Sequence, residues 1–297
     1  MIKRQLETLL VRTVGARVSR RRGRALVLAY HNIVPNGERA RGELSLHLPQ
    51  HAFGEQLDFI RAEFDVVPLH SITRPRPAGA CDAVAITFDD AYRGAMTAGV
   101  DELARRGLPA TVFVAPAFVG GRTFWWDMLA SRRGALDDAR RIRLLDELRG
   151  DQETILARAR ADDWPVDEEL PAHARVATEA ELAAAVARGI TLGAHSWSHP
   201  NLARLGAAEL AHQLDAPLPW LGARFGSAVL PWLAYPYGSN SADVRLAAAR
   251  AGYEGALAIA GGWHRPAEPP RHAIPRLNVS AGLSLDGFVL RAAGVLT

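Results

Sequence analysis

The chain carries a series of short, uninterrupted apolar runs, each about the length of a β-strand. Runs that are apolar on both faces are typical of parallel strands covered by helices on either side. The runs are Ala25–Tyr30, Val84–Phe88, Ala110–Val114, Ile190–Gly193, Trp232–Tyr235, Ala256–Ile259 and Ile274–Val279. This pattern predicts a parallel sheet at the centre of the molecule.

Segments with helical periodicity lie between these runs. In the first of them, apolar residues recur at a spacing of three and four. The segment that begins at Thr178 opens with Thr178-x-x-Glu181, a capping box, which indicates the start of a helix. In other segments a glycine after the last periodic residue indicates the end of the helix. The predicted helices are Phe53–Phe64, Thr97–Arg106, Thr178–Arg188 and Asp243–Arg250. Strand–helix alternation of this kind implies an α/β barrel or a doubly wound sheet.

Two segments fall outside the alternation. Residues 1–24 have apolar positions on one helical face and many basic residues elsewhere, which predicts an N-terminal basic helix. Residues 125–176 are charged and helix-prone, and we interpret them as a helical insertion within a single domain that spans residues 25–297. The basic helix could make peripheral contact with an anionic membrane surface. We favour solvated arginines instead, since charge runs usually are solvated faces.

Composition narrows the function classes only slightly. A chain of 297 residues, 48% of them hydrophobic, can bury a large core, and a formal net charge of +3 gives no case for nucleic-acid binding. Cys81 is the single cysteine, so an intramolecular disulfide is excluded. Neither a secretory signal nor a membrane-spanning stretch is evident. We therefore expect a cytoplasmic protein. The basic helix also allows a peripheral location at the inner membrane.

An aspartate pair, Asp89 and Asp90, closes one of the apolar runs. Adjacent strand residues point to opposite sides, but where the strand ends the chain turns and both side chains can reach one cavity. Two neighbouring carboxylates repel each other, and a divalent metal removes that repulsion. The alternative is a helix N-cap, a position that aspartate favours.

Two histidines, His195 and His199, follow another apolar run at a spacing of four. On a helix or helical turn this spacing places both rings on one face, where they can bind one metal ion. A His-His-Asp set with open positions suits Zn²⁺, and Co²⁺, Ni²⁺ or Fe²⁺ also fit it. The two motifs together supply three ligands and a spare carboxylate as base, the equipment for metal-assisted hydrolysis. Two solvated histidines on a surface loop are the alternative.

Three motifs in order give the chain a specific resemblance to the polysaccharide deacetylases, which share the NodB homology domain of carbohydrate esterase family 4. Thr87-Phe88-Asp89-Asp90 resembles the first family motif, and His195-Ser196-Trp197-Ser198-His199 resembles the second. Tyr235-Pro236-Tyr237-Gly238 resembles the core of the third. The resemblance covers most of the chain, from about Leu26 to Val279.

The resemblance implies a distorted (β/α)7-type barrel. It implies Asp90, His195 and His199 as ligands of a divalent metal, with Asp89 as the general base. In this chemistry the metal lowers the pKa of a water molecule and polarises the carbonyl of an N-acetyl group. It further implies that the metal and a backbone N–H near Tyr237 hold the oxyanion, and that a general acid protonates the departing amine.

The chain departs from the commonest family pattern beside the site. Ala234 stands where the third motif usually has an arginine that braces the base, and we propose Arg276 as a substitute brace, the alternative being a solvated arginine. The usual C-terminal histidine motif is absent, but the segment around His31 resembles the permuted subgroup that includes the poly-N-acetylglucosamine deacetylases. That likeness implies His31 as the general acid. A histidine that merely ends a buried strand is the alternative.

Aromatic residues near the motifs are candidates for contact with a sugar. Trp125 and Trp126 open the helical insertion, where they could stack on sugar rings or equally anchor the insertion to the barrel. Pro236 and Tyr237 of the third motif, with Arg276, complete the candidate substrate site. The remaining histidines, which we interpret as structural or solvated, are His47, His51, His70, His173, His212, His264 and His272.

The combined prediction is a metal-dependent enzyme that removes the N-acetyl group of an amino sugar in a glycan or glycan precursor, releasing acetate and a free amine. Its partner would be an N-acetylated saccharide. Two alternatives stay open. The same site would serve a hydrolase of another C–N bond, such as a deformylase or a cyclic amidase. A non-catalytic glycan-binding protein could also keep this fold, because function follows the site and not the fold.

Overall fold

The computed structural model describes residues 23–77, 79–130, 135–266 and 271–295. The predicted N-terminal basic helix lies almost wholly outside these ranges, so its structure and its membrane contact stay predictions. Within the ranges, no helix is both long enough and apolar enough to cross a membrane.

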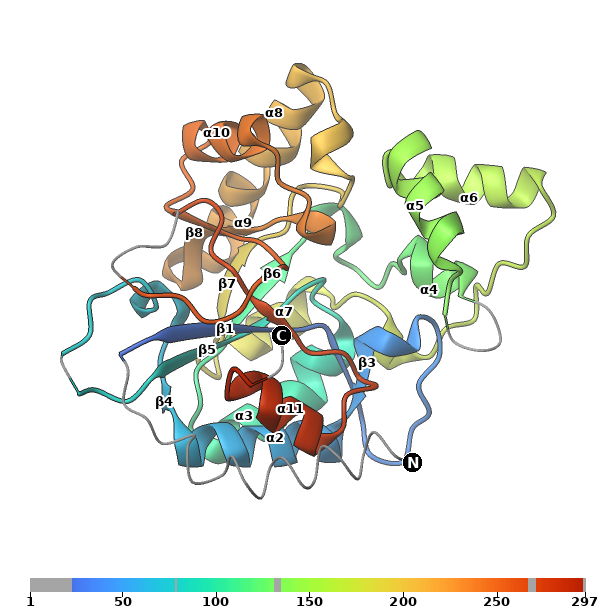
Figure 1. The fold of residues 1–297 in the computed structure, drawn as a ribbon. Helices are drawn as coiled ribbons and strands as arrows, with labels where there is room; N and C mark the ends of the chain where they lie inside the picture. The colour runs from blue at the N-terminus through green and yellow to red at the C-terminus, as the bar shows by residue number, and fades with distance from the viewer. Residues whose placement is uncertain (1–22, 78, 131–134, 267–270, 296–297) are drawn as a thin grey trace.

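A curled parallel sheet forms the centre of the molecule, with helices around its outside (Figure 1). Its strands follow the order β10-β1-β5-β6-β7-β8-β9, and β4 pairs with the first residues of β5. All of these pairings are parallel, as the continuous apolar runs predict. The strands are β1 (Ala25–Tyr30), β4 (Asp65–Val66), β5 (Ala83–Phe88), β6 (Thr111–Val114), β7 (Thr191–Ala194), β8 (Val229–Ala234), β9 (Gly255–Leu257) and β10 (Leu277–Asn278). A second, two-stranded sheet joins β2 (Asn32–Val34) to β3 (His47–Pro49).

The segment after β9 closes the main sheet into a distorted barrel. Ile274 bridges Leu257 of β9, and a few residues later Leu277 pairs with Leu28 of β1. One short stretch of chain therefore joins the two ends of the sheet. This closure confirms the predicted α/β barrel.

Successive side chains of a strand pack alternately in the barrel interior and against the helices outside. In β1, Ala25 and Val27 belong to the interior cluster, whereas Leu26 and Leu28 belong to the larger cluster packed against the helices. The small interior side chains leave room for large ones such as Phe113. Because both faces of the strand are buried, the run contains no polar position.

The covering helices agree with the predicted ones to within a few residues where a prediction was made. Helix α7 begins with the predicted capping box, in which Thr178 and Glu181 each bond to the other's backbone N–H. Three further helices, α8, α9 and α11, were not predicted. The covering helices are α2 (Gln50–Glu63), α3 (Val100–Arg106), α7 (Glu179–Val186), α8 (Ala207–Asp215), α9 (Pro217–Phe225), α10 (Ala242–Arg250) and α11 (Leu285–Ala292).

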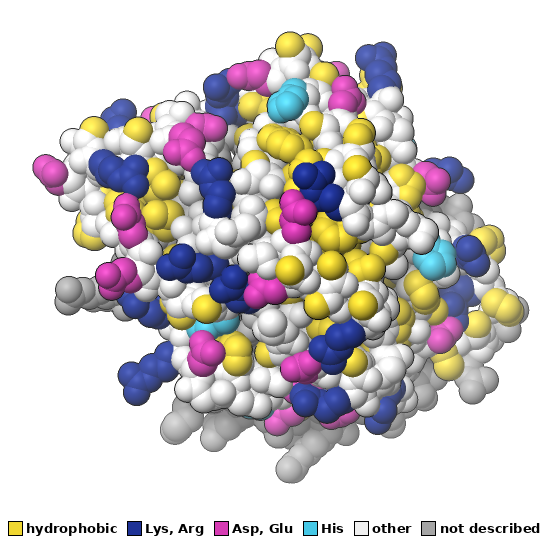
Figure 2. Space-filling model, turned by 180° about the vertical axis from the view of Figure 1, so that it is seen from behind, with side chains coloured by type: hydrophobic (Ala, Val, Ile, Leu, Met, Phe, Trp, Pro, Cys, Tyr) yellow, Lys and Arg dark blue, Asp and Glu magenta, His cyan; other side chains and the backbone are white. Residues whose placement is uncertain are grey.

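The predicted insertion contains three helices that stand beside the barrel (Figure 1). They are α4 (Trp125–Leu129), α5 (Asp138–Glu147) and α6 (Gln152–Ala161). Asp137 and Asp151 cap α5 and α6 by accepting backbone N–H groups of the first turn. The face of the molecule in Figure 2 carries acidic and basic side chains interspersed rather than in separate fields.

Candidate active site

The aspartate pair lies at the carboxyl end of β5, where the chain turns sharply. The Asp89 N–H donates to the Tyr30 carbonyl at 2.9 Å, which continues the pairing with β1 by one residue. Asp90 and Ala91 then have φ values of 68° and 49°, a left-handed conformation that needs tertiary support. The two carboxylates contact arginine and histidine side chains rather than helix N–H groups, so the N-cap alternative is wrong.

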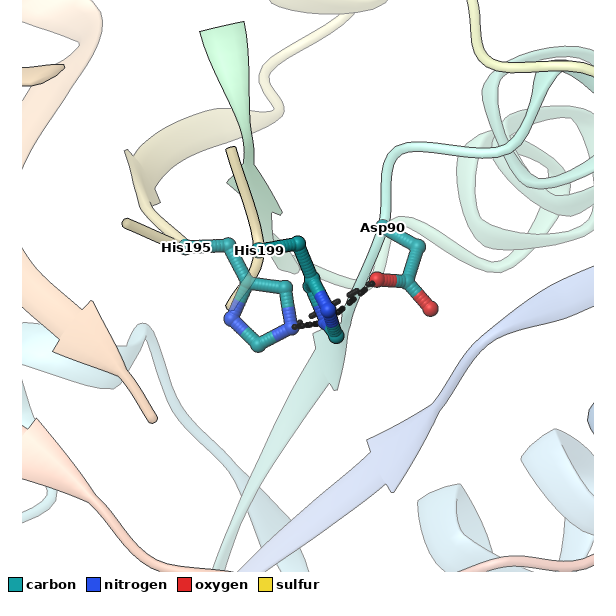
Figure 3. A group of neighbouring side chains, drawn as sticks. All are labelled: Asp90, His195 and His199. Atoms are coloured by element: carbon teal, nitrogen blue, oxygen red, sulfur yellow. Dashed lines mark hydrogen bonds and ion pairs between the residues drawn. The ribbon is translucent and has the colours of Figure 1, made fainter. Parts of the chain in front are cut away.

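The two histidines lie on a loop after β7. The backbone over His195–His199 is neither a helix nor a helical turn, because Ser196 and His199 are left-handed, with φ values of 59° and 57°. Ser196 Oγ closes the loop by accepting the His199 N–H at 3.0 Å. The loop folds back on itself, so the two rings converge although the path between them is not helical (Figure 3).

Asp90, His195 and His199 converge on one point (Figure 3). His199 Nε2 lies 3.2 Å from Asp90 Oδ1 and 3.1 Å from His195 Nε2, and His195 Nε2 lies 3.5 Å from Asp90 Oδ1. Ligand atoms about 2.0–2.1 Å from a tetrahedral zinc ion are roughly 3.3 Å apart, so these spacings fit one ion. All three side chains are buried, and their donor atoms suit a divalent metal.

A backbone carbonyl orients the His195 ring. Nδ1 of His195 donates to the Ala234 carbonyl at 2.7 Å, which places the proton on Nδ1 and leaves the Nε2 lone pair for a metal. Burial lowers the pKa of His195 to about 4, although the charge of Asp89 opposes the shift. The ring is therefore neutral near pH 7, the form in which imidazole binds a metal.

A glutamine from α8 fixes the middle of the histidine loop. Gln213 Oε1 accepts the N–H groups of Trp197 and Ser198, at 3.1 and 2.9 Å. Gln213 Nε2 donates to Ser198 Oγ at 2.8 Å. Gln213 was not predicted as a site residue, because it lies on a helix that was not predicted and has no motif beside it.

Arg276 forms a two-point ion pair with Asp89. The arginine is fully buried, and its Nη1 and Nη2 donate to Asp89 Oδ1 and Oδ2, both at 2.7 Å. Its Nε donates to the Ala258 carbonyl at 2.9 Å. Burial alone would raise the pKa of the Asp89 carboxyl, but the Arg276 guanidinium outweighs it and holds that pKa well below its usual range. The geometry favours the predicted brace over direct contact between Arg276 and a substrate.

His31 follows β1 and lines the same cavity as Asp89 and Asp90. Burial lowers the pKa of His31, and the charges of both aspartates oppose that shift. The side chain of the next residue, Asn32, is bonded to the His47 ring at 2.8 Å, which fixes the backbone beside His31. The structure thus brings the predicted general acid to the cavity of the predicted base.

Trp126 and Tyr237 form an aromatic wall of this cavity. Their rings pack against the His199 ring, with centroid separations of 4.9 and 4.7 Å. Trp125 is 1% exposed, and its Nε1 donates to the Tyr237 hydroxyl at 3.2 Å. Of the two tryptophans, Trp126 lines the cavity, whereas Trp125 anchors the insertion and supports Tyr237.

The third motif is a tight turn after β8. Tyr237 and Gly238 both have left-handed backbone, with φ values of 58° and 69°. A Cβ atom at Gly238 would lie 2.2 Å from Ile259 Cγ2, so the position accepts only glycine. Pro236 is buried in the turn and presents no surface to the cavity, whereas Tyr237 lines it.

A buried polar network supports the aromatic wall from behind. Asp127 is 1% exposed and accepts hydrogen bonds from the His47 ring at 2.8 Å and the Tyr92 hydroxyl at 2.6 Å. The Tyr92 oxygen in turn accepts the indole N–H of Trp126 at 2.9 Å. His47 is structural, as predicted. The position of Asp127 directly after two tryptophans could have indicated this network in the sequence, since a carboxylate buried among aromatic residues needs polar partners.

The catalytic candidates Asp89, Asp90, His31, His195 and His199 line a cleft of about 520 Å³ together with the aromatic wall. Clefts of about 300–1,000 Å³ are typical of small-molecule sites in proteins. The strand ends and the aromatic wall supply part of the lining, and helix α5 of the insertion supplies another part. The contribution of α5 was not predicted, because helical periodicity does not show where an insertion docks.

Comparison with known proteins confirms the predicted family. The family model described as polysaccharide deacetylase matches residues 77–256, more than half of the chain. The chain therefore belongs to the polysaccharide deacetylase family. The matched segment contains the aspartate pair, the histidine motif and the third motif, whereas His31 and Arg276 lie outside it. Among curated proteins there is no significant match.

Several solved structures share the fold. The Streptococcus pyogenes deacetylase PplD, in complex with acetate, is 16% identical with a TM-score of 0.62, over 91% of this chain and 98% of that one. IcaB from Ammonifex degensii is 16% identical with a TM-score of 0.62, over 93% and 98% of the two chains. The BpsB deacetylase domain from Bordetella bronchiseptica is 16% identical with a TM-score of 0.53, over 86% and 96%. At these identities the likeness establishes the fold alone.

Proposed function

We propose that this protein is a metal-dependent hydrolase that removes the N-acetyl group of an amino sugar in a glycan or glycan precursor. One observation carries the proposal: Asp89, held from behind by the buried Arg276, lines the same cleft as the converging Asp90, His195 and His199 side chains. Membership of the polysaccharide deacetylase family supports a saccharide amide as the substrate.

Asp90, His195 and His199 would hold the metal. Zn²⁺ is the first choice for two imidazoles and one carboxylate, and Co²⁺, Ni²⁺ and Fe²⁺ are further candidates. When bound, the metal supplies Lewis-acid chemistry that makes water a nucleophile near neutral pH and polarises the acetyl carbonyl. The Nδ1–H of His195 stays committed to the Ala234 carbonyl, which keeps the ring in the ligand orientation.

Asp89 is suited to accept a proton from the attacking water. Its carboxylate is ionised throughout the neutral pH range, because Arg276 keeps its pKa low. Each carboxylate oxygen offers two lone pairs, and the bidentate contact with Arg276 uses one on each. A second lone pair on each oxygen is therefore left for water, and the guanidinium prevents the carboxylate from rotating.

His31 would protonate the departing amine nitrogen, since it lines the cleft together with Asp89. The backbone N–H of Tyr237 has no acceptor among the described residues, and we assign it to the oxyanion that forms when water attacks the acetyl carbon. Trp126 and Tyr237 would enclose the acetamido group between aromatic surfaces.

The test is acetate release from N-acetylglucosamine and its oligomers by zinc- or cobalt-loaded protein. The proposal predicts release by the wild type, and a fall in kcat of about 10²–10⁴-fold in Asp89→Asn, which removes the general base. Asp101→Asn is the matched control: Asp101 pairs with Arg188 at the surface, and its loss should leave the rate within about two-fold.

Absence of acetate from every oligomer, with metal bound, would overturn the proposal. Formate release from N-formyl sugars, or opening of a cyclic amide, in the same samples would identify a hydrolase of another C–N bond. Saccharide binding without any turnover would identify a glycan-binding protein.

A further inference from the structure

The cleft has one wall that the catalytic motifs do not supply. Helix α5 and the residues just before it belong to the insertion, which stands beside the barrel (Figure 1). The residues of this wall are Ala135, Leu136, Asp138, Arg141 and Leu145. Since they line the same cleft as the catalytic candidates, they are placed to contact the part of a substrate that does not react.

We propose that Arg141 and Asp138 form a subsite for a neutral sugar unit next to the acetylated one. The inference rests on the proposed function, because it says how the same cleft would select an oligosaccharide. In this proposal the insertion recognises a second sugar, and the barrel side of the cleft carries out the hydrolysis.

A buried carboxylate holds Arg141 in position. The Glu43 side chain is 4% exposed, and its Oε2 accepts from Arg141 Nη2 and, at 3.2 Å, from the Leu136 N–H. Its Oε1 accepts the Ser45 hydroxyl at 2.9 Å, and the Glu43 N–H donates to Asp127 Oδ1 at 2.9 Å. The arginine is thus attached to the same buried network that supports the aromatic wall, which pre-orders it for a ligand.

The guanidinium of Arg141 keeps donors for a ligand. Its side chain is 27% exposed, and among the described residues Glu43 is its ion-pair partner through one nitrogen. Arg141 lines the same cleft as Trp126 and Tyr237, the two residues of the aromatic wall. A guanidinium carries five N–H donors, so several remain for hydroxyl groups at the cleft.

The charges of this wall favour a neutral sugar over an anionic group. Glu43 already neutralises Arg141, and Asp138 adds an exposed carboxylate to the same wall. A phosphate or carboxylate would be repelled by these acids, whereas sugar hydroxyls both donate and accept hydrogen bonds. Leu136 and Leu145 supply apolar surface for the C–H groups of a sugar ring.

The neighbouring Arg140 provides a matched control on the same helix. Its guanidinium lies over the Trp164 ring, 4.4 Å from the centroid. It lines a different cavity, between the insertion and the segment that includes Arg41 and Gly42. A substitution at Arg140 therefore removes one arginine from α5 without altering the catalytic cleft.

The experiment compares kcat/KM of metal-loaded wild type, Arg141→Met and Arg140→Met. The substrates are N-acetylglucosamine, its dimer to pentamer, and 4-nitrophenyl acetate, a small ester that needs only the catalytic groups. We expect Arg141→Met to lower kcat/KM for the oligomers about ten-fold, mainly through KM, and to change the monosaccharide and the ester less than about two-fold. Arg140→Met should leave all substrates unchanged.

A second variant guards against misfolding, because removal of Arg141 leaves Glu43 buried without its partner. Asp138 is exposed, so Asp138→Asn should fold normally and weaken oligomer hydrolysis about three-fold, with no effect on the ester. Oligomer kinetics unchanged in both variants would overturn the subsite. Equal losses on the ester and the oligomers would also overturn it, because Arg141 would then act through the catalytic groups. Wild-type protein that releases no acetate from any saccharide would instead count against the proposed function.

Discussion

The barrel side and the insertion side of the cleft are built differently. On the barrel side, Asp89 and Asp90 are buried at a strand end, where Arg276 holds Asp89 and left-handed backbone fixes the turn at Asp90. On the insertion side, Arg141 is partly exposed and held by one ion pair, and Asp138 is exposed. Catalytic groups must stay within a fraction of an ångström of their working positions, and the barrel side meets this requirement through burial and a fixed backbone. We therefore assign the hydrolysis to the barrel side of the cleft and the selection of the substrate to the insertion side.

The largest effect should come from the metal ligands, because they define the barrel side. His199→Ala should reduce bound zinc well below one ion per chain and lower kcat/KM by about 10³-fold or more. Metal analysis of the purified protein and acetate release measure the two effects. His51→Ala is the control, since His51 is exposed on α2, and it should keep full metal content and activity. Full zinc content in His199→Ala would contradict the ligand assignment.

The Arg276–Asp89 pair should show the next largest effect, this time on stability. Arg276→Met leaves a buried carboxylate without its partner and should lower the free energy of unfolding by about 3–5 kcal/mol. Asp58→Asn removes a two-point pair with Arg106 at the surface and should cost about 1 kcal/mol or less. Denaturant titration measures both.

The double variant Arg276→Met, Asp89→Asn separates stability from catalysis. It removes both buried charges, so much of the lost stability should return, while kcat for acetate release stays at least about 10²–10⁴-fold below that of the wild type. If the double variant were as unstable as Arg276→Met, the buried charge would not be the cause of the destabilisation.

A smaller effect is expected at Gln213, which holds the histidine loop without touching the metal position. Gln213→Ala should weaken zinc affinity about 10–100-fold, the usual effect of removing support behind a metal ligand. Gln152→Ala is the matched control, because Gln152 also accepts a backbone N–H, that of Trp125, but lies away from the histidine loop. Competition with a chelating dye measures affinity without reference to activity. Equal zinc affinities in the two variants would show that Gln213 does not support the metal ligands.

The barrel side could be predicted largely from the sequence, because its groups follow apolar strands in short motifs. Asp89, Asp90, His195 and His199 were predicted in this way. The conformation of the histidine loop was not, since periodicity gives no sign of two left-handed residues. His31 and Arg276 are far from the motifs in the chain. They reach the site because closure of the barrel places β1 between β10 and β5.

The insertion side could not be predicted beyond its helices. The charged, helix-prone composition of residues 125–176 indicates helices, but their docking depends on contacts with Glu43 and His47, which no local pattern connects to the insertion. Helices α8 and α9 escaped prediction because only Ala216 separates them and Pro217 begins the second, so the periodic pattern is interrupted. The residues that we propose to select a substrate can thus be identified only from the folded structure.

The central claim is that the barrel side of the cleft hydrolyses an N-acetyl group with a bound metal. The most direct measurement follows acetate and free amine together when zinc-loaded protein acts on N-acetylglucosamine oligomers, before chelation, after chelation and after zinc is restored. We expect the two products in equal amounts, their loss on chelation and their return with zinc. Protein that binds zinc at its three-residue site yet forms neither product from any oligomer would contradict it.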